Sequence, residues 1–445
     1  MKKDLLKSEC TKRVNAQNCS ESFFIRSNQY HPCPKNHNIN SSSPIFQSFY
    51  SMSKLVVLAY SGGLDTSYCV KYFLAQGMTV HSVIVNTGGF SADELKEIEA
   101  RAYRLGVQKH VTLNETANYY AKCIKYLVFG NVLKNNTYPL SVSAERVFQS
   151  LAIAGYAKEV GADFVAHGST GAGNDQVRFD AAFTVLIPNV AILTPIRDNK
   201  LSREQEIEFL IQNGVSQDWT KAQYSINKGL WGTTVGGKET LTSDEYLPES
   251  AFPTQLSKHE PEELTLHFTK GELTGLNGET MPPVQAIQRI AELAQPFAIG
   301  RDIHVGDTII GIKGRVGFEA AAPLIIIKAH HTLEKHTLTK AQLALKEQAA
   351  AMYGSLLHEG QFLEPAMRNC ETLLESTQAT VSGTVKVYLA PYRFHVVGIS
   401  SPHDLMQAKF GKYGEMNNAW SGQDVRGFAK IVSNQAMMFN SVNQE

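Results

Sequence analysis

Seven consecutive residues supply donors of the kind that an anion needs: Ser61-Gly62-Gly63-Leu64-Asp65-Thr66-Ser67. The two glycines permit a sharp turn, which brings backbone N–H groups close to a bound anion. Thr66 and Ser67 add hydroxyl donors, and a helix that begins here adds the positive end of its dipole. No lysine follows the glycines, so the segment is not a Walker A loop. The pattern favours a phosphate-binding loop over an ordinary glycine turn.

A second segment, from His167 to Phe179, reads HGSTGAGNDQVRF and also concentrates polar groups. Its polar and flexible positions suit a loop that fits around small zwitterions: Thr170, Gly171, Gly173, Asn174 and Asp175. Arg178 offers a planar guanidinium that can hold a carboxylate through two hydrogen bonds. A surface ion pair is the alternative role for Arg178.

The elements around both segments alternate between buried strands and amphipathic helices. Residues 55–60 form an unbroken apolar run of the buried parallel type. A helix is expected over 65–76, a strand over 79–85, and a helix capped by Ser91 and Glu94. Further strands are expected near 109–113, 163–167 and 190–194. This alternation predicts an α/β doubly wound parallel sheet, whose ligands bind beyond the carboxyl ends of the strands.

The pattern changes after about residue 222. Leu264, Leu266 and Phe268 alternate as in a half-buried strand, Asn277-Gly278 is a hairpin turn signal, and Pro283 begins a helix. We predict a second, α+β domain. From about residue 422 the pattern weakens, and we interpret this stretch as an arm that grips a neighbouring subunit. The predicted division is an extension over 1–52, a nucleotide-binding domain over 53–222, the second domain over 223–421 and the arm over 422–445.

Charge argues against a nucleic-acid partner. The chain has 42 basic and 42 acidic side chains, and residues 1–52 hold seven of the basic and three of the acidic ones. The remaining residues are therefore slightly acidic, whereas nucleic-acid binding needs a surplus of Lys and Arg. No apolar run approaches the roughly 18 residues that span a bilayer. We expect no nucleic acid and no membrane as partners.

The first 51 residues lack apolar periodicity and match neither a secretory signal nor a mitochondrial presequence. Because Met52 directly precedes the first strand, we expect this extension to be a dispensable tail or a start-site artefact. Cys69, Cys123 and Cys370 are widely spaced, which fits a reducing cytoplasm and no cysteine metal site. The histidines at 330, 331 and 336 are expected to be exposed rather than metal-binding.

The loop from Ser61 to Ser67 resembles the pyrophosphate-binding loop of the N-type ATP pyrophosphatases. The segment from His167 to Phe179 closely resembles the second motif of argininosuccinate synthase, and the resemblance runs along nearly the whole chain from Met52. Further matching positions are Tyr138-Pro139-Leu140, Ser225, Leu230-Trp231-Gly232, Gly311-Ile312-Lys313, Arg315 and Phe318-Glu319.

This resemblance implies a ligase reaction. ATP would activate the ureido oxygen of citrulline as an adenylate, and the amino group of aspartate would then displace AMP to give argininosuccinate. ATP with Mg²⁺ is implied, without an organic prosthetic group, and so is a homotetramer formed through the C-terminal region.

The resemblance also assigns site residues. Catalytic roles fall to Asp65, Ser67 and Asp175, and aspartate binding to Thr170, Asn174 and Asp175. ATP binding falls to Ala59, Tyr60, Ser61, Gly62, Gly63, Leu64, Asp65, Thr66, Ser67, Val85 and Gly168. Citrulline binding falls to Tyr138, Ser143, Asn174, Arg178, Ser225, Thr234, Asp307 and Phe318.

Two departures from the family pattern fall near citrulline. Gly306 stands where the family has a glutamate that contacts citrulline, and Phe318 replaces a tyrosine whose hydroxyl also reaches it. Their loss would leave the α-ammonium of citrulline poorly paired, which is costly for a buried charge. Either Asp307 supplies the missing carboxylate, or the substrate is a citrulline with an acylated amino group.

Two other functions remain open on the sequence alone. One is a tRNA-thiolating enzyme with the same ATP loop, although that class needs a basic face and usually a catalytic cysteine pair. The other is a degenerate, non-catalytic binder, although the two motifs above are intact.

Overall fold

The structure is a computed structural model that describes residues 53–217, 219, 223–409, 411, 413–415 and 419–443. The predicted extension over 1–52 lies outside these residues, and the first strand begins at Leu55. Within the described residues, no helix combines the length and the apolar character that crossing a membrane requires.

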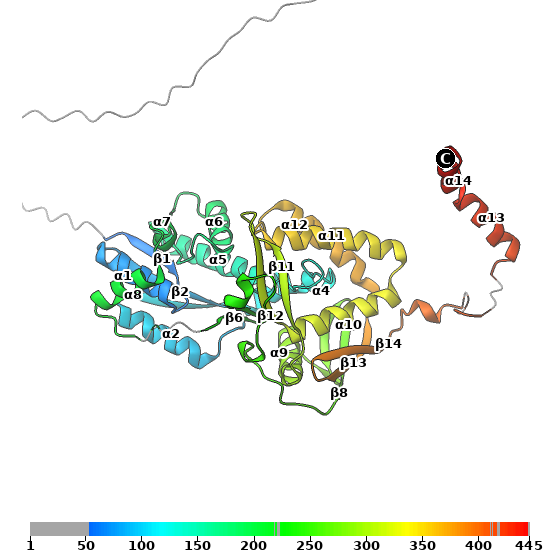
Figure 1. Ribbon diagram of the computed structural model, residues 1–445, viewed down its shortest axis with the longest axis horizontal. Coiled ribbons are helices and arrows are strands. Elements are labelled where there is room, and N and C mark those ends of the chain that lie inside the picture. The colour runs from blue at the N-terminus through cyan, green and yellow to red at the C-terminus, as the bar shows by residue number, and fades with distance from the viewer. Residues whose placement is uncertain are drawn as a thin grey trace, which may run out of the picture. The chain divides into compact units, whose positions relative to one another are not determined.

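The first sheet has five parallel strands in the order β3-β2-β1-β4-β5 (Figure 1). Its strands are β1 (Leu55–Ala59), β2 (Thr79–Asn86), β3 (Lys109–Asn114), β4 (Phe164–Ala166) and β5 (Ala191–Leu193). Alternate side chains of β1 enter opposite cores: Val56 and Leu58 enter one, and Val57 and Ala59 the other. Both faces are therefore covered by helices, which confirms the predicted doubly wound sheet.

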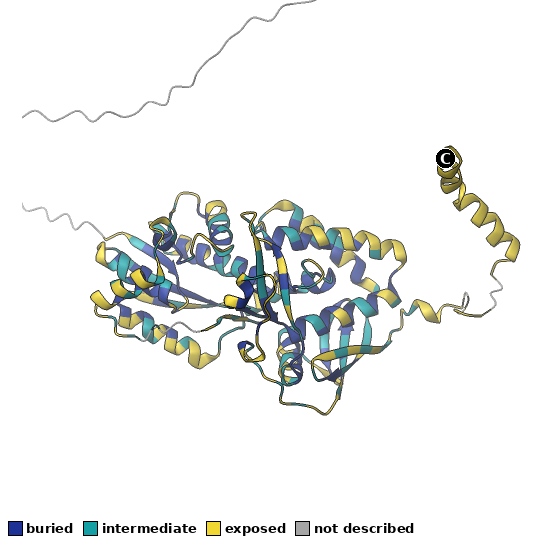
Figure 2. Ribbon diagram, viewed as in Figure 1, coloured by how far each residue is buried: buried dark blue, intermediate teal, exposed yellow. Residues whose placement is uncertain are grey.

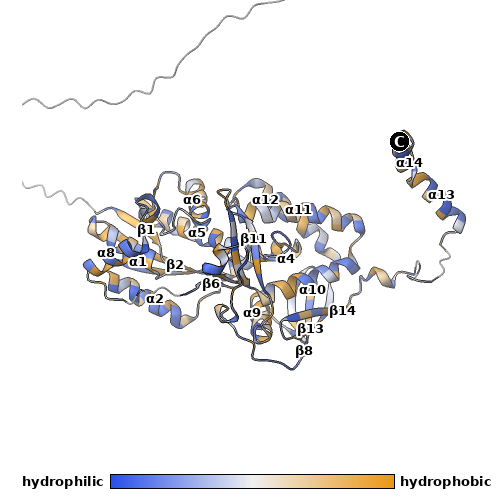
Figure 3. Cartoon of the chain, in the orientation of Figure 1, coloured by the Kyte–Doolittle hydropathy of each residue, from blue (hydrophilic) through white to orange (hydrophobic). Residues whose placement is uncertain are grey.

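The helices that cover this sheet separate into two layers. One core contains residues of α1 (Leu64–Ala75), α2 (Ala92–Leu105), α7 (Pro195–Asp198) and α8 (Arg203–Gln212). The other contains residues of α5 (Ser141–Glu159) and α6 (Asp175–Leu186). In Figure 3 the strand β1 between them is largely apolar, as burial on both faces requires.

Local signals set the ends of these helices. The predicted capping box of α2 is present: Ser91 Oγ accepts from the N–H of Glu94, and Glu94 Oε2 accepts from the N–H of Ser91. The same helix ends at Gly106, whose φ of 103° lies in the left-handed region that favours glycine.

The second half of the chain contains two antiparallel sheets, which confirms the predicted change of fold class. The four-stranded sheet has the order β11-β12-β7-β6, with β6 (Ser225–Gly229), β7 (Gly232–Gly236), β11 (Arg301–Asp307) and β12 (Lys313–Glu319). The five-stranded sheet has the order β10-β9-β8-β13-β14, with β8 (Glu262–Thr269), β9 (Glu272–Leu276), β10 (Glu279–Thr280), β13 (Gly383–Ala390) and β14 (Arg393–Ser400). Asn277 and Gly278 join β9 to β10 with positive φ at both residues, as a type I′ turn requires.

The largest core lies between these sheets and their helices (Figure 2). The helices are α3 (Thr116–Tyr119), α4 (Lys125–Phe129), α9 (Pro283–Ala294), α10 (Ala321–Thr337), α11 (Lys340–His358) and α12 (Pro365–Ser376), with a π-helical turn at Tyr120–Ile124. The first half of α5 also contributes to this core. Trp231, Phe297 and Tyr353 are fully buried in this core.

The expectation of exposed histidines was wrong for His330, which is fully buried in α10. Its Nδ1 lies 2.8 Å from Asn131 Oδ1 and its Nε2 lies 2.9 Å from Gln378 Oε1. Burial lowers the pKa of His330 to about 4, so the ring is neutral at pH 7. On the same helix, Glu334 pairs with Lys346 Nζ at 2.9 Å. His330 is therefore part of a buried polar network.

The C-terminal stretch is more regular than predicted from the sequence. It forms α13 (Gly422–Val432) and α14 (Asn434–Val442), and Ser421 with Asp424 makes a capping box at the start of α13. Val425, Phe428 and Val432 follow helical spacing, and all three side chains are exposed (Figure 2). The expectation of a weakly patterned stretch was therefore wrong, because this spacing is that of an amphipathic helix.

Replacing Lys346 with methionine is predicted to destabilise the fold by roughly 3–5 kcal/mol, because it leaves the buried Glu334 carboxylate without its ion pair. Urea unfolding measures the loss. Lys335→Met, at an exposed position of α10, is the matched control and should change stability little. Equal unfolding free energies for the two variants would contradict the prediction.

Candidate functional site

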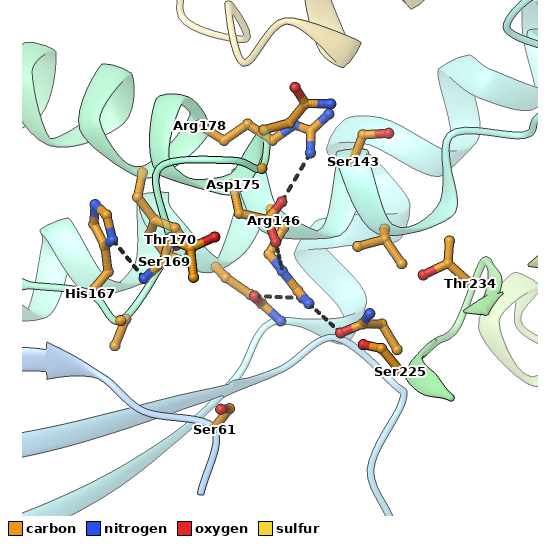
Figure 4. Close-up of a pocket in the computed structure, with 18 of the residues that line it drawn as sticks. Ser61, Ser143, Arg146, His167, Ser169, Thr170, Asp175, Arg178, Ser225 and Thr234 are labelled. Carbon is orange, nitrogen blue, oxygen red and sulfur yellow. Dashed lines mark hydrogen bonds and ion pairs between the residues drawn. The ribbon is translucent and has the colours of Figure 1, made fainter. Parts of the chain in front are cut away.

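A cavity of about 690 Å³ lies where the loops after β1 and β4 leave the first sheet. The strand order reverses between these two strands, which is where ligands bind in open α/β sheets. Residues of the four-stranded sheet and the end of α11 complete the lining, so both halves of the chain contribute (Figure 4).

The loop after β1 leaves hydrogen-bond donors free for an anion. Gly62 has a φ of 77°, and its carbonyl accepts from Arg101 Nη1 at 2.6 Å. Helix α1 begins at Leu64, and no side chain caps its N-terminus. The first backbone N–H groups of that helix therefore have no intrahelical acceptor, which makes the loop suitable for a phosphate.

Most of the residues assigned from the sequence line this cavity: Ala59, Tyr60, Ser61, Gly63, Leu64, Asp65, Thr66, Val85, Tyr138, Ser143, Gly168, Thr170, Asn174, Asp175, Arg178, Ser225, Thr234 and Asp307. Gly62, Ser67 and Phe318 are not among the lining residues. The hydroxyl of Ser67 is buried and donates to the carbonyl of Gly63 at 2.7 Å. Phe318 is fully buried and packs against the ring of Tyr138.

Two carboxyl groups lie close together beneath the loop. Burial raises the pKa of Asp65, and burial together with the charge of Asp65 raises the pKa of Glu206 to about 8. The Glu206 side chain is buried, and its Oε2 has no hydrogen-bond partner among the described residues. Glu206 is therefore protonated at pH 7, and the charge beneath the loop stays low.

Asp175 is held by two arginines (Figure 4). Its Oδ2 accepts from Arg146 Nε at 3.1 Å, and its Oδ1 accepts from Arg178 Nη1 at 3.0 Å. Burial alone would raise the pKa of Asp175, but the two guanidinium groups outweigh it and lower that pKa. Asp175 is therefore ionised and fixed in position.

Arg178 is buried, which excludes the alternative of a surface ion pair. Besides Asp175 it contacts the carbonyl of His358, at the end of α11, through Nε at 3.1 Å and Nη2 at 2.9 Å. One N–H of each Nη group remains for a ligand.

Arg146 was not among the predicted site residues. Its Nη2 donates to Asn227 Oδ1 at 3.0 Å, which connects α5 to β6. The adjacent Glu145 is buried, accepts a hydrogen bond from Thr87, and lies 3.7 Å from Arg146 Nη1. The sequence signal that could have indicated this role is a pair of opposite charges, Glu145 and Arg146, within a largely apolar stretch of α5.

Two of the remaining assigned side chains, Asn174 and Asp307, already have partners within the protein. Asn174 Oδ1 accepts from the N–H of Ile309 at 2.8 Å, so the tip of the β11–β12 hairpin reaches the loop after β4. The Asp307 carboxylate pairs with Lys313 Nζ at 2.6 Å, and its side chain is 66% exposed. The lining residues that were not assigned from the sequence include His304, Arg315 and His358.

A parallel sheet with an anion-binding loop at its switch point, closed over by a second domain, defines a two-domain nucleotide-binding α/β protein. Family models agree with this class: the arginosuccinate synthase N-terminal HUP domain matches residues 55–216, and the arginosuccinate synthase C-terminal domain matches residues 224–439. The chain belongs to the argininosuccinate synthase family.

Individual relatives match over most of their length. Argininosuccinate synthase from Methanocaldococcus jannaschii is 34% identical over 392 residues, which cover 87% of this chain and 98% of that protein. The enzyme of the same name from Xanthomonas campestris is 34% identical over 404 residues, covering 88% of this chain and all of the relative. A solved structure of NMN synthetase from Francisella tularensis aligns with 38% of this chain and 66% of its own, at 15% identity and a TM-score of 0.27.

Replacing Glu206 with glutamine is predicted to flatten the dependence of stability on pH. The folded state keeps a proton on Glu206 up to about pH 8, whereas the unfolded chain loses it near 4.5, so stability falls as pH rises between these values. Glutamine has no such proton to lose. The melting temperature should therefore fall less between about pH 5 and pH 8.5 in Glu206→Gln than in the unaltered protein.

The matched control is Glu208→Gln, at an exposed position of the same helix, which should retain the pH dependence of the unaltered protein. Superimposable profiles of melting temperature against pH for Glu206→Gln and the unaltered protein would count against a raised pKa of Glu206.

Proposed function

We propose that the protein condenses citrulline with aspartate at the expense of ATP and so forms argininosuccinate, AMP and pyrophosphate, a step of arginine biosynthesis. The observation that carries the proposal is that one cavity contains both the anion-binding loop and the ionised Asp175 with its two arginines. Membership of the argininosuccinate synthase family supports the same reaction. That membership favours free citrulline over an acylated form and over tRNA thiolation.

In the first step, the ureido oxygen of citrulline attacks the α-phosphorus of ATP. The bond from that phosphorus to the bridging oxygen breaks, and pyrophosphate leaves. The loop from Ser61 to Thr66 would hold the phosphates, and its N–H groups would stabilise the charge that develops on the leaving group. Ala59, Val85 and Gly168 line the part of the cavity assigned to adenosine.

In the second step, the deprotonated amine of aspartate attacks the ureido carbon, and AMP leaves. Thr170, Asn174 and Asp175 would bind aspartate, and Tyr138, Ser143, Ser225 and Thr234 would position citrulline. Catalysis would come chiefly from holding the two reactants at the correct distance and angle. Asp175 contributes because its two arginines fix the loop that carries it.

Mg²⁺ accompanying ATP fits the chemistry of this cavity. Mg²⁺ is bound by one or two carboxylates together with substrate phosphates, and Asp65 lies at the loop and lines the cavity. Asp65 would hold the ion. When bound, the ion would neutralise phosphate charge.

The proposal includes a cytoplasmic location and a homotetramer. The three cysteines in the described residues are free thiols, which supports a reducing compartment. The exposed apolar side chains of α13 and α14 support a role for this arm in contacts between subunits.

The reaction is tested by measuring AMP and pyrophosphate. Both products should form only when citrulline and aspartate are present together. Asp175→Asn should lower kcat/KM by roughly 100-fold, because the neutral amide no longer fixes both arginines. Asp198→Asn, an exposed member of an ion pair with Arg197, is the matched control and should remain close to the unaltered enzyme. ATP cleavage that depends on RNA instead of citrulline would refute the proposal.

The arm is tested by light scattering after gel filtration. Phe428→Glu places a charge on the apolar face of α13 and should lower the measured mass of the assembly. Lys430→Glu, a charge change at an exposed position two residues further along the same helix, should leave that mass unchanged. Loss of mass in both variants, or in neither, would contradict a specific apolar contact.

A further inference from the structure

His304 occupies space that a side chain at position 306 would otherwise take. Both residues belong to β11 and line the cavity. A Cβ atom added to Gly306 would lie 2.6 Å from His304 Nε2, which is too close for any real contact. The imidazole of His304 can therefore lie beside residue 306 only because that residue is glycine.

The cavity provides few carboxylates for a substrate ammonium group. Among the described lining residues these are Asp65, Asp175 and Asp307. Asp65 belongs to the phosphate loop, Asp175 is paired with two arginines, and Asp307 is paired with Lys313. An amino group that enters near Gly306 therefore needs another acceptor.

The ring of His304 is a suitable acceptor. It is buried and stacks on the ring of Tyr138 with 5.2 Å between centroids, and its Nε2 is the nitrogen that lies 2.6 Å from the Cβ position of residue 306. Burial, followed by the charge of Lys134, lowers the pKa of His304, so the ring is neutral at pH 7. A neutral imidazole has one nitrogen that accepts a hydrogen bond.

We propose that His304 determines specificity for the acceptor substrate by accepting a hydrogen bond from the α-ammonium of citrulline in the space beside Gly306. This inference rests on the proposed function. In this chain the imidazole of His304, two residues earlier on the same strand, would take the role of the carboxylate that the family resemblance places at position 306. A larger residue at 306 would therefore require the imidazole of His304 to move, because both need the same space.

The test compares KM values of purified full-length variants. His304→Phe keeps the volume and the stacking on Tyr138 but removes both ring nitrogens, so KM for citrulline should rise about tenfold while KM for aspartate and ATP stays unchanged. Gly306→Ala should raise KM for citrulline in the same selective way, because the added methyl displaces the imidazole. His395→Phe, at an exposed position of β14, is the matched control and should change none of the three.

Unchanged citrulline KM in His304→Phe and Gly306→Ala would overturn the inference, as would an equal rise for all three substrates. A preference of the unaltered enzyme for N-acylated citrulline would also overturn it, because that compound has no α-ammonium. These outcomes are distinct from failure of the proposed function, in which the unaltered protein would not form AMP and pyrophosphate from citrulline and aspartate at all.

Discussion

The ion pairs of Asp175 with Arg146 and Arg178 are the interaction on which the site depends. Asp175 begins α6, and Arg146 lies in α5. Arg146 also contacts Asn227 of β6, and Arg178 contacts the carbonyl of His358 at the end of α11. One carboxylate therefore joins four elements from both halves of the chain. Without it, the guanidinium groups of the buried Arg178 and the half-buried Arg146 would repel each other.

The cost of buried charge is reduced in two different ways around the cavity, by ion pairing and by protonation. Around Asp175 the charges are retained, since each has a partner at hydrogen-bond distance that offsets the cost of losing water. Beneath the loop after β1 the charge is removed instead, because burial and the neighbouring Asp65 keep Glu206 protonated. The first arrangement keeps three charged side chains at the cavity, and the second keeps additional negative charge away from the loop after β1.

The sequence predicted those features whose causes are local. The strand–helix alternation, the capping box at Ser91 and the turn at Asn277 each depend on neighbouring residues, and the structure contains all three. Arg146 was missed because its partner Asn227 is 81 residues away, and His330 was wrongly expected to be exposed because Asn131 is 199 residues away. A single sequence does not show which distant residue such a side chain will contact.

The contact between Arg178 and His358 has a consequence for a chain that is still being synthesised. The two residues are 180 positions apart, whereas the first sheet and its phosphate loop are complete by Leu193. Domains fold in order as they emerge from the ribosome. The first sheet can therefore form well before His358, whose carbonyl holds Arg178, has been synthesised. A nascent or truncated chain would thus have the loop after β1 but not the contact between Arg178 and the carbonyl of His358. The complete site would form only late in translation.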